Sequence, residues 1–172
     1  MSFWNGNKES FEKLVIRHKD KLIYFICRYV KSIDIAEDIA QDVYVYLLIH
    51  KENYDFEYSL KTYLFTIAKS KSLNYLKREK KIVQINENDI YDMQTLEERV
   101  FLNERKNNLK QAIKKLKPEY QNAVYLADIE ELSYKEIGKI MQKSESGIKV
   151  LIYRARKSLE EILRKEAAKY EG

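Results

Sequence analysis

The sequence predicts an all-α protein of two small helical domains joined by a flexible linker, with a helix-turn-helix in the second domain. Only four glycines and one proline occur among the 172 residues, so few turns interrupt the chain. Apolar residues recur at helical spacing from about residue 8 to about residue 168. A polar, acidic and weakly periodic stretch over residues 84–98 separates two helical blocks. We therefore expect domains over residues 1–82 and 107–172, with a linker over 83–106.

Three helices are expected in the first domain. The first carries apolar side chains at helical spacing from Phe11 to Tyr29. The second begins where Asp34 and Glu37 have the pattern of a capping box, with Asp34 as the cap. The third follows a short aromatic loop. These helices cover about residues 8–30, 34–50 and 59–80.

Four helices are expected in the second block, and two of them begin at clear signals. Pro118 suits a first helical position, because the backbone N–H that proline lacks has no intrahelical acceptor there. Ser133 and Glu136 have the pattern of a capping box that opens a short helix. These helices cover about residues 96–116, 118–129, 133–141 and 144–168.

The positive charge of the chain is concentrated in one stretch. The whole chain carries a formal net charge of +5. Residues 61–81 alone hold seven lysines and arginines against one acidic residue, Glu79. Because this local excess is larger than the charge of the whole protein, it indicates a polyanionic partner.

Several classes of protein are disfavoured by what the sequence lacks. The single cysteine, Cys27, leaves no internal disulfide and fits a reducing cytoplasm. The N-terminus lacks the plan of a signal peptide, and the longest apolar runs, 22–27 and 43–49, are too short to span a bilayer. Two histidines and one cysteine offer no metal cluster, and no phosphate loop or catalytic triad is present. We expect a cytoplasmic protein without membrane insertion, metal, cofactor, small-molecule substrate or enzymatic activity.

Residues 132–157 have the pattern of a helix-turn-helix, which places its second helix in the major groove of DNA. In that helix, apolar side chains are spaced to pack inward at Ile148, Leu151, Ile152, Ala155 and Leu159. Basic and aromatic side chains remain outward, and two serines lie where free backbone N–H groups favour a phosphate. The residues predicted to bind duplex DNA are Ser144, Ser146, Lys149, Tyr153, Arg154, Arg156 and Lys157. The alternative is a plain amphipathic hairpin with a solvated charged face.

This segment resembles region 4 of the extracytoplasmic-function sigma factors. The shared pattern consists of Leu116 and Pro118, the string from Ser133 to Gly138, Lys149, and the string from Tyr153 to Leu159. In that family this domain reads the −35 promoter element, which implies contacts from Lys149, Tyr153 and Arg154. Ser146-Gly147 replaces the usual Gly-Thr and Val150-Leu151 the usual Ser-Arg, so the −35 sequence itself is not predicted.

One face of the helix over 34–50 is predicted to bind RNA polymerase. Its members, at i, i+3, i+4 and i+7, are Asp38, Gln41, Asp42 and Val45. The buried stripe of the same helix is expected at Ile39, Val43, Tyr46 and Leu47. From the spacing alone, this polar face is more typical of a solvent-exposed surface than of an interface. Residues 36–42, however, resemble the family's region 2.2, which binds the coiled-coil clamp of the polymerase largest subunit, and this resemblance implies an interface.

The helix over 59–80 and the aromatic loop before it are predicted to bind unpaired DNA. Aromatic rings beside a basic groove suit unpaired bases, because every base has a face to stack. The residues concerned are Tyr54, Phe56, Tyr58, Lys61, Tyr63, Ser70, Lys71, Asn74, Lys77 and Arg78. The alternative for the aromatic residues is a place in the core, which is favoured for Phe56 and Tyr63 and equally open for Tyr54 and Tyr58.

Residues 62–78 resemble regions 2.3 and 2.4 of the same family, which capture the non-template strand of the −10 element. Tyr63 stands where tryptophan is usual, and Ser70 where asparagine is common. The resemblance implies a sigma factor that binds core RNA polymerase and promoter DNA, recognises −35 and −10 elements and helps to melt the latter. It also implies an anti-sigma factor as a further partner. From the residues alone, a regulator that acts without polymerase and a helical adaptor that binds no DNA both remain open.

Overall fold

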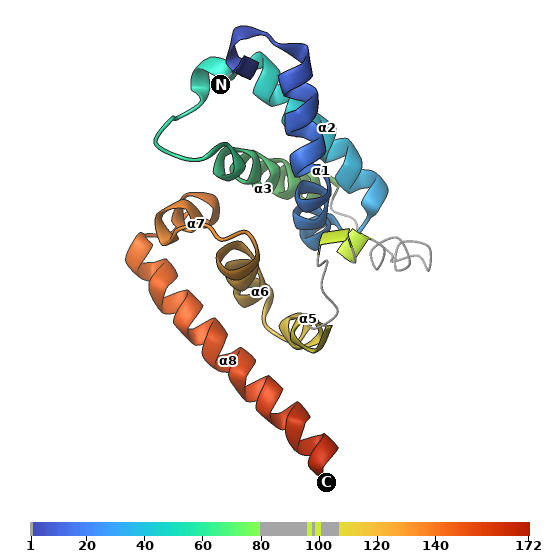
Figure 1. Cartoon of the computed structure of the whole chain (residues 1–172), viewed down its shortest axis with the longest axis vertical. Coiled ribbons are helices and arrows are strands. Elements are labelled where there is room, and N and C mark those ends of the chain that lie inside the picture. Colours follow the sequence, from blue (N-terminus) through green and yellow to red (C-terminus); the bar gives the residue numbers. More distant parts are fainter. Residues whose placement is uncertain (1, 80–95, 98, 101–106) are drawn as a thin grey trace. The chain divides into compact units, whose positions relative to one another are not determined.

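All regular secondary structure in the computed structural model is helical within the residues that the structure describes, 2–79, 96–97, 99–100 and 107–172 (Figure 1). The chain divides into two compact units, residues 1–102 (unit 1) and residues 103–172 (unit 2). None of the described helices combines the length and the apolar character that a membrane span requires. The all-α fold class is confirmed.

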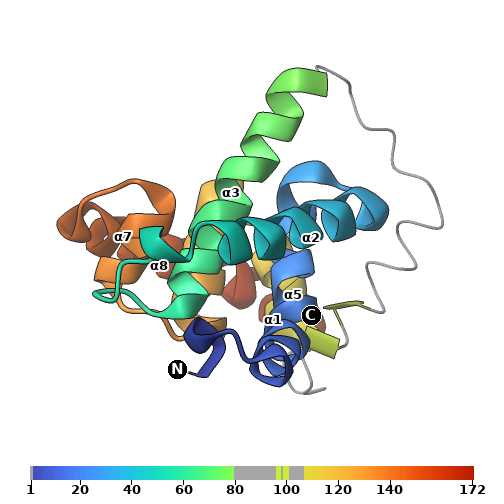
Figure 2. The same cartoon turned by 90° about the horizontal axis from the view of Figure 1, so that it is seen from above.

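Unit 1 is built on three long helices that pack pairwise against one another, α1 (Lys8–Val30), α2 (Ile33–Ile49) and α3 (Leu60–Glu79) (Figures 1 and 2). The short 3-10 helices η1 (Ser2–Asn5) and η2 (Lys51–Asn53) precede α1 and follow α2. All three long helices contribute to one apolar core. Its members include Leu22, Phe25, Ile26, Val43, Leu47, Leu64, Phe65 and Ala68, each at most 2% exposed.

The junction between α1 and α2 corrects the predicted start of the second helix. Lys31 adopts a left-handed conformation with φ of 57° and ends α1, while its N–H donates to the carbonyl of Cys27. Ser32 is extended, and its hydroxyl accepts from the N–H of Ile35 at 3.5 Å. Ser32 is therefore the N-cap, and the prediction of Asp34 was wrong. Asp34 lies in the first turn, where a carboxylate is favoured by the positive end of the helix dipole.

Four residues of the predicted linker are described, and they belong to the folded body of unit 1. Leu96 and Glu97 are 1% and 5% exposed. Arg99 forms an ion pair with Asp20 of α1, with 3.5 Å between Nε and Oδ2. These residues are not solvated as a linker would be, because the apolar side chain of Leu96 is buried. The rest of segment 83–106 lies outside the described residues, so its boundaries stay a prediction.

Unit 2 consists of α5 (Asn107–Lys114), α6 (Pro118–Val124), the π-helical turn η4 (Tyr125–Ile129), α7 (Tyr134–Met141) and α8 (Glu145–Glu171). The expected helix over 118–129 is thus an α-helix that widens into a π turn. Pro118 does occupy a first helical position. One core cluster joins α5, α6 and α8 and comprises Ala112, Ile113, Leu116, Val124, Ala155 and Leu159.

Candidate nucleic-acid and polymerase interface

The outer face of α2 presents the four residues that were predicted to bind polymerase. Asp38, Gln41, Asp42 and Val45 are all exposed, and Val45 is 51% exposed. The same stripe continues toward the end of α2 with two more exposed apolar side chains, Leu48 and Ile49, at 42% and 64%. The face therefore has an acidic half followed by an apolar half, and Leu48 and Ile49 of the apolar half were not among the predicted residues.

The buried stripe of α2 differs from the predicted one at a single position. Ile39, Val43 and Leu47 are buried as expected. Tyr44 is buried instead of Tyr46, and its hydroxyl donates to the carbonyl of Val15 at 3.4 Å. The partner helix α1 makes the buried sector of α2 wide enough to include Tyr44.

Tyr46 is half-buried and links α2 to the basic helix α3. Its ring stacks on that of His50, with 4.1 Å between centroids and 20° between planes. The ammonium of Lys71 lies 5.3 Å from the same ring centroid, a cation–π geometry. One of the predicted strand-binding cations is thus positioned by an aromatic ring of the neighbouring helix.

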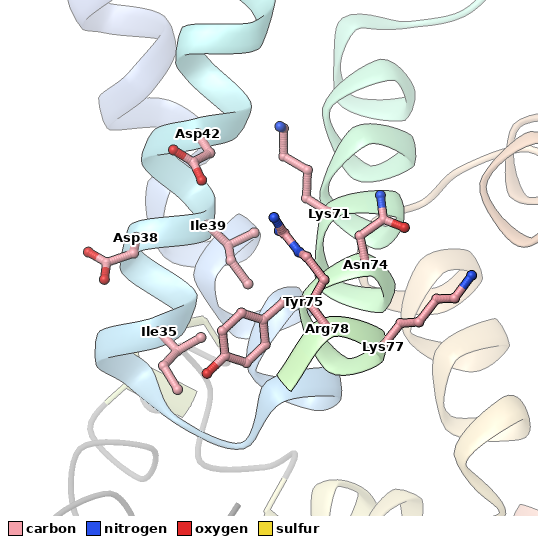
Figure 3. A pocket seen from close by; sticks show the side chains of 9 residues that line it. All are labelled: Ile35, Asp38, Ile39, Asp42, Lys71, Asn74, Tyr75, Lys77 and Arg78. Atoms are coloured by element: carbon pink, nitrogen blue, oxygen red, sulfur yellow. The ribbon is translucent and has the colours of Figure 1, made fainter. Parts of the chain in front are cut away.

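A groove of about 920 Å³ lies between α2 and α3 and contains members of both predicted sites (Figure 3). Asp38 and Asp42 line its α2 side, although the Asp38 carboxylate points away from α3 in Figure 3, and four polar or basic residues line its α3 side. No ion pair joins these carboxylates to those cations in the part of the chain that the structure describes. The residues that line the groove are Ile35, Asp38, Ile39, Asp42, Lys71, Asn74, Tyr75, Lys77 and Arg78.

Most of the predicted strand-binding residues of α3 are exposed and lie in the second half of the helix. Ser70, Asn74, Lys77 and Arg78 are exposed, and Lys71 is half-buried. Lys61 is half-buried in the first turn of α3, about two turns before this group. In Figure 3 the side chain of Arg78 reaches into the groove, while Lys77 points away from α2. The cations are therefore available on two sides of the end of α3.

The aromatic loop before α3 forms a cluster whose centre is Tyr54. Its ring lies edge-on to those of Phe56 and Tyr63, at centroid distances of 4.7 and 5.2 Å. Its hydroxyl donates to the carbonyl of Tyr58 at 2.7 Å. Tyr54, Tyr58 and Tyr63 are half-buried, so these rings both close the domain and border its surface.

Phe56 does not occupy the core place that was favoured for it. It is 64% exposed, because residues 55–58 form a turn in which the N–H of Glu57 donates to the carboxylate of Asp55 at 2.9 Å. Tyr63 lies closer to expectation, since its hydroxyl is buried without a hydrogen-bond partner among the described residues. Burial raises the pKa of Tyr63, and the nearby Tyr46 and Glu52 raise it further.

The helix-turn-helix of unit 2 has the caps that its sequence predicts. The Ser133 hydroxyl accepts from the N–H of Glu136, and the Glu136 carboxylate accepts from the N–H of Ser133, which completes the capping box. Gln142 ends α7 in a left-handed conformation with φ of 56°. The hydroxyl of Ser144 accepts from the N–H of Gly147 at 3.1 Å and caps α8.

The turn between α7 and α8 depends on a close approach at Gly138. A Cβ built at this position would lie 2.6 Å from the carbonyl oxygen of Lys143, which is backbone and has little room to move. The N–H of Lys143 donates to the carbonyl of Gly138 at 3.0 Å. The turn is also held by an ion pair of 3.0 Å between Lys143 and Glu119. The start of α8 is therefore fixed to α7 and to the start of α6.

The first half of α8 separates inward from outward side chains as predicted. The five apolar positions from Ile148 to Leu159 are buried. The outward residues are exposed, including Tyr153 at 66%, whose ring centroid lies 5.9 Å from the ammonium of Lys157. The remaining predicted duplex-binding residues are also exposed: Ser144, Ser146, Lys149, Arg154 and Arg156.

Arg156 differs from the other predicted duplex-binding cations, Lys149, Arg154 and Lys157, because among the described residues it alone forms an ion pair. Its guanidinium donates to the carboxylate of Asp128 in η4, with 2.6 Å between Nη2 and Oδ1. This hydrogen bond is the main cause of a raised pKa for Arg156. Arg156 was predicted to bind duplex DNA with the other cations, because Asp128 is distant in sequence and no local pattern connects the two.

Comparison with known proteins relates both units to one family. The family model of sigma-70 region 2 matches residues 14–82, and that of sigma-70 region 4 matches residues 106–159. The ECF RNA polymerase sigma factor SigM of Bacillus subtilis is 30% identical over 137 residues, which is 78% of this chain and 83% of SigM. The chain belongs to the extracytoplasmic-function sigma factors.

Other relatives cover nearly the whole of this sigma factor. The RNA polymerase sigma factor YlaC of Bacillus subtilis is 27% identical over 164 residues, covering 92% of this chain and 95% of YlaC. The solved sigma factor RpoE of Bartonella quintana, in complex with the anti-sigma factor NepR, has the same fold with a TM-score of 0.63. It is 18% identical, over 91% of this chain and 98% of that one. The chain is therefore an RNA polymerase sigma factor, as its sequence predicted.

No metal-binding arrangement is found in the described part of this sigma factor, where no three histidine, cysteine or acidic side chains gather in a suitable group. Sigma factors are transcription initiation factors, which act by binding.

Proposed function

We propose that this sigma factor reads a promoter with two separate surfaces while it holds core RNA polymerase with a third. The observation that carries the proposal is the combination of a capped helix-turn-helix with exposed Lys149, Tyr153 and Arg154 along its second helix. A helix presented in this way fits the major groove, where lysine and arginine reach guanine edges or phosphates. The surface on α8 is therefore assigned to the −35 duplex, with Ser144 and Ser146 near a phosphate at the helix start.

The proposed polymerase surface is the outer face of α2. Asp38, Gln41 and Asp42 supply polar and acidic contacts, and Val45 begins an apolar continuation through Leu48 and Ile49. Exposed apolar side chains that adjoin a charged patch are typical of protein interfaces. A partner helix with basic side chains at one end and apolar side chains at the other would complement both halves of this face.

The proposed strand-capturing surface is formed by the end of α3 and the aromatic loop. Lys71, Lys77 and Arg78 provide charge for the phosphates, and Ser70 and Asn74 provide hydroxyl and amide groups for base edges. Stacking on an aromatic side chain is worth about 1–3 kcal/mol per base. Extruding a base from a duplex costs on the order of a few kcal/mol. One or two stacked bases with phosphate contacts thus offset local melting, so the sigma factor needs no nucleotide hydrolysis and is not an enzyme.

A second protein partner is proposed from the relatives. The sigma factor RpoE of Bartonella quintana was solved with the anti-sigma factor NepR. By analogy, an anti-sigma factor is expected to cover the polymerase surface or the DNA surfaces of this chain when transcription is not required. The protein is expected to act in the cytoplasm, where polymerase and promoter DNA are found.

The proposed function is tested by reconstitution. The full chain is mixed with core polymerase, and the transcripts from a genomic template are sequenced and compared with those of core enzyme alone. We expect a defined set of start sites that share upstream elements in two blocks. Failure to co-purify with core enzyme, together with the absence of new start sites, would contradict the proposal. Tight duplex binding without polymerase binding would favour the alternative of an independent helix-turn-helix regulator.

A further inference from the structure

The N-terminal 3-10 helix η1 places an additional aromatic ring in the cluster around Tyr54. The indole of Trp4 stacks on the Tyr54 ring, with 4.8 Å between centroids and 28° between planes. Trp4 is also close to Phe56, with 5.6 Å between ring centroids. It is the single tryptophan of the chain and lies 50 positions before Tyr54, so no local pattern connects the two. Its position is a property of the folded unit.

Packing on both sides holds η1 in place. Phe3 is 6% exposed, and its ring stacks on that of Phe11 in α1, with 5.4 Å between centroids. The ammonium of Lys51 lies 5.0 Å from the Phe3 ring centroid. The chain then turns into α1 at Gly6, where φ of +84° favours glycine. Trp4 is therefore anchored through its neighbour Phe3.

Tyr54 is half-buried in this arrangement, and the exposed ring of Phe56 borders the surface of the cluster. One face of Tyr54 is covered by Trp4, and its hydroxyl is bonded to the carbonyl of Tyr58. Phe56 is 64% exposed and Trp4 is half-buried, and their planes make an angle of 55°. Tyr54 thus contacts both the half-buried ring of Trp4 and the more exposed ring of Phe56.

We propose that Trp4 and Phe56 form the surface on which an unpaired base of the non-template strand stacks, with Tyr54 as the support beneath them. The inference rests on the proposed function, in which unit 1 captures the −10 strand. It makes Trp4 a base-contacting residue of promoter recognition that lies outside the segment matched by region 2, residues 14–82.

The charges around the cluster favour a base over a phosphate at this point. Within residues 51–58, Glu52, Asp55 and Glu57 are exposed beside the cluster, against one cation, Lys51. Three carboxylates repel the phosphate backbone, while the faces of the aromatic rings attract a base of any kind. The backbone is instead expected to follow the cations of α3, so that one base turns inward onto the two rings.

The test uses holoenzyme reconstituted from the full chain on a promoter identified by the transcript sequencing described above. Trp4→Ala is expected to lower the equilibrium constant for promoter opening about tenfold, equivalent to about 1.4 kcal/mol, as for the loss of one stacked base. Trp4→Phe, which retains an aromatic plane, should restore most of the loss. Ile16→Ala is the matched control, because Ile16 is an exposed apolar residue of α1, at 77%.

Abasic sites in the non-template strand then distinguish base stacking from a general effect. At the captured position, an abasic site should weaken opening by the unaltered holoenzyme but add nothing to Trp4→Ala, because both remove the same interaction. Additive losses at every position would overturn the inference. Unchanged opening by Trp4→Ala holoenzyme would overturn it as well, while leaving the proposed function intact.

Two measurements keep the test independent of folding and of the proposed function. Core binding and the helical circular dichroism of each variant are recorded, and Phe56→Ala is tested in the same abasic scan if Trp4→Ala lowers the helix content. The exposed ring of Phe56 can be removed without opening the core. If the unaltered holoenzyme opens no promoter at all, the proposed function fails and this inference fails with it.

Discussion

Arg156 donates two hydrogen bonds to Asp128, from Nη2 to Oδ1 at 2.6 Å and from Nε to Oδ2 at 3.4 Å. This pair ties α8 to η4 and holds one guanidinium against the body of unit 2. Lys149 and Arg154, on the same helix, make no ion pair within the described residues. Of the cations of α8, Arg156 therefore stabilises the fold of unit 2, while Lys149 and Arg154 remain available to bind a partner.

This division predicts different results for two arginine substitutions. Arg154→Ala should weaken binding to the −35 duplex about tenfold and reduce the salt slope of binding by about one unit, since a phosphate or base contact is lost. Arg156→Ala should change affinity much less and lower the free energy of unfolding by under about 1 kcal/mol, because the pair is about half exposed. Fluorescence anisotropy over a range of salt concentrations measures the affinity and its salt slope. Urea unfolding measures the free energy of unfolding. If Arg154→Ala and Arg156→Ala lost affinity and salt slope equally, the two arginines would not have the different roles proposed for them.

The close approach at Gly138 predicts a stability defect. Gly138→Ala gains about 1 kcal/mol of helix propensity. It also places a methyl group against the Lys143 carbonyl, where overpacking costs about 1–3 kcal/mol. We expect a lower melting temperature and weaker −35 binding, because the start of α8 must shift. Gly6→Ala is not a suitable control, because the positive φ of Gly6 would strain an alanine there. Ala167→Gly, at an exposed site of α8, measures the effect of helix propensity alone. A Gly138→Ala protein as stable as the original would show that the turn adapts freely.

The acidic half of the α2 face predicts a polymerase-binding defect. Asp38→Asn with Asp42→Asn should weaken core binding by at least about tenfold, because two charged contacts are lost while shape is retained. Asp34→Asn is the control, since Asp34 is exposed in the first turn of the same helix. Competition against labelled sigma factor for core enzyme measures the affinities. The proposed polymerase surface would be wrong if the double variant, the control variant and the unaltered chain all bound core equally.

The cations at the end of α3 predict the salt dependence of strand binding. Removing two phosphate contacts with Lys77→Gln and Arg78→Gln should reduce the slope of log affinity against log salt by about 1.4 for a single strand. The loss of affinity should be similar for all sequences, because phosphates carry no sequence information. Arg17→Gln, an exposed cation of α1, serves as the control. An unchanged slope would remove these residues from the proposed strand path.

Buried tyrosines of unit 1 predict a loss of stability in alkali. Burial raises the pKa of Tyr29 to about 12, and burial also raises the pKa of Tyr44. An unfolded tyrosine releases its proton near pH ~10. The folded state therefore holds more protons above this pH, and stability falls as the pH rises from ~10 toward about 12. Denaturant midpoints at increasing pH should show this fall, and Tyr29→Phe should reduce it. If stability fell equally with pH in Tyr29→Phe, the raised pKa of Tyr29 would not be a cause of the loss.

Local signals in the sequence were sufficient for much of unit 2. The capping box at Ser133 and the proline at position 118 act within one turn of helix, so their pattern can be read without the fold. The inward and outward sides of α8 follow from helical periodicity, which is also local. The same reasoning failed at Asp34, because Ser32 offered a competing cap two residues earlier and only the extended backbone at Ser32 selects between them.

Helical periodicity and capping residues in this sequence thus determined an all-α chain and the inward and outward sides of its recognition helix, while the resemblance of its motifs indicated the family. The tertiary structure alone decided that Trp4 covers Tyr54, that Arg156 is bound to Asp128, and that acidic residues of α2 line one groove together with cations of α3. These relationships join residues that are distant along the chain. They depend on how amphipathic helices pack, and a helical period specifies which side of a helix is buried but not which residues of another helix it meets.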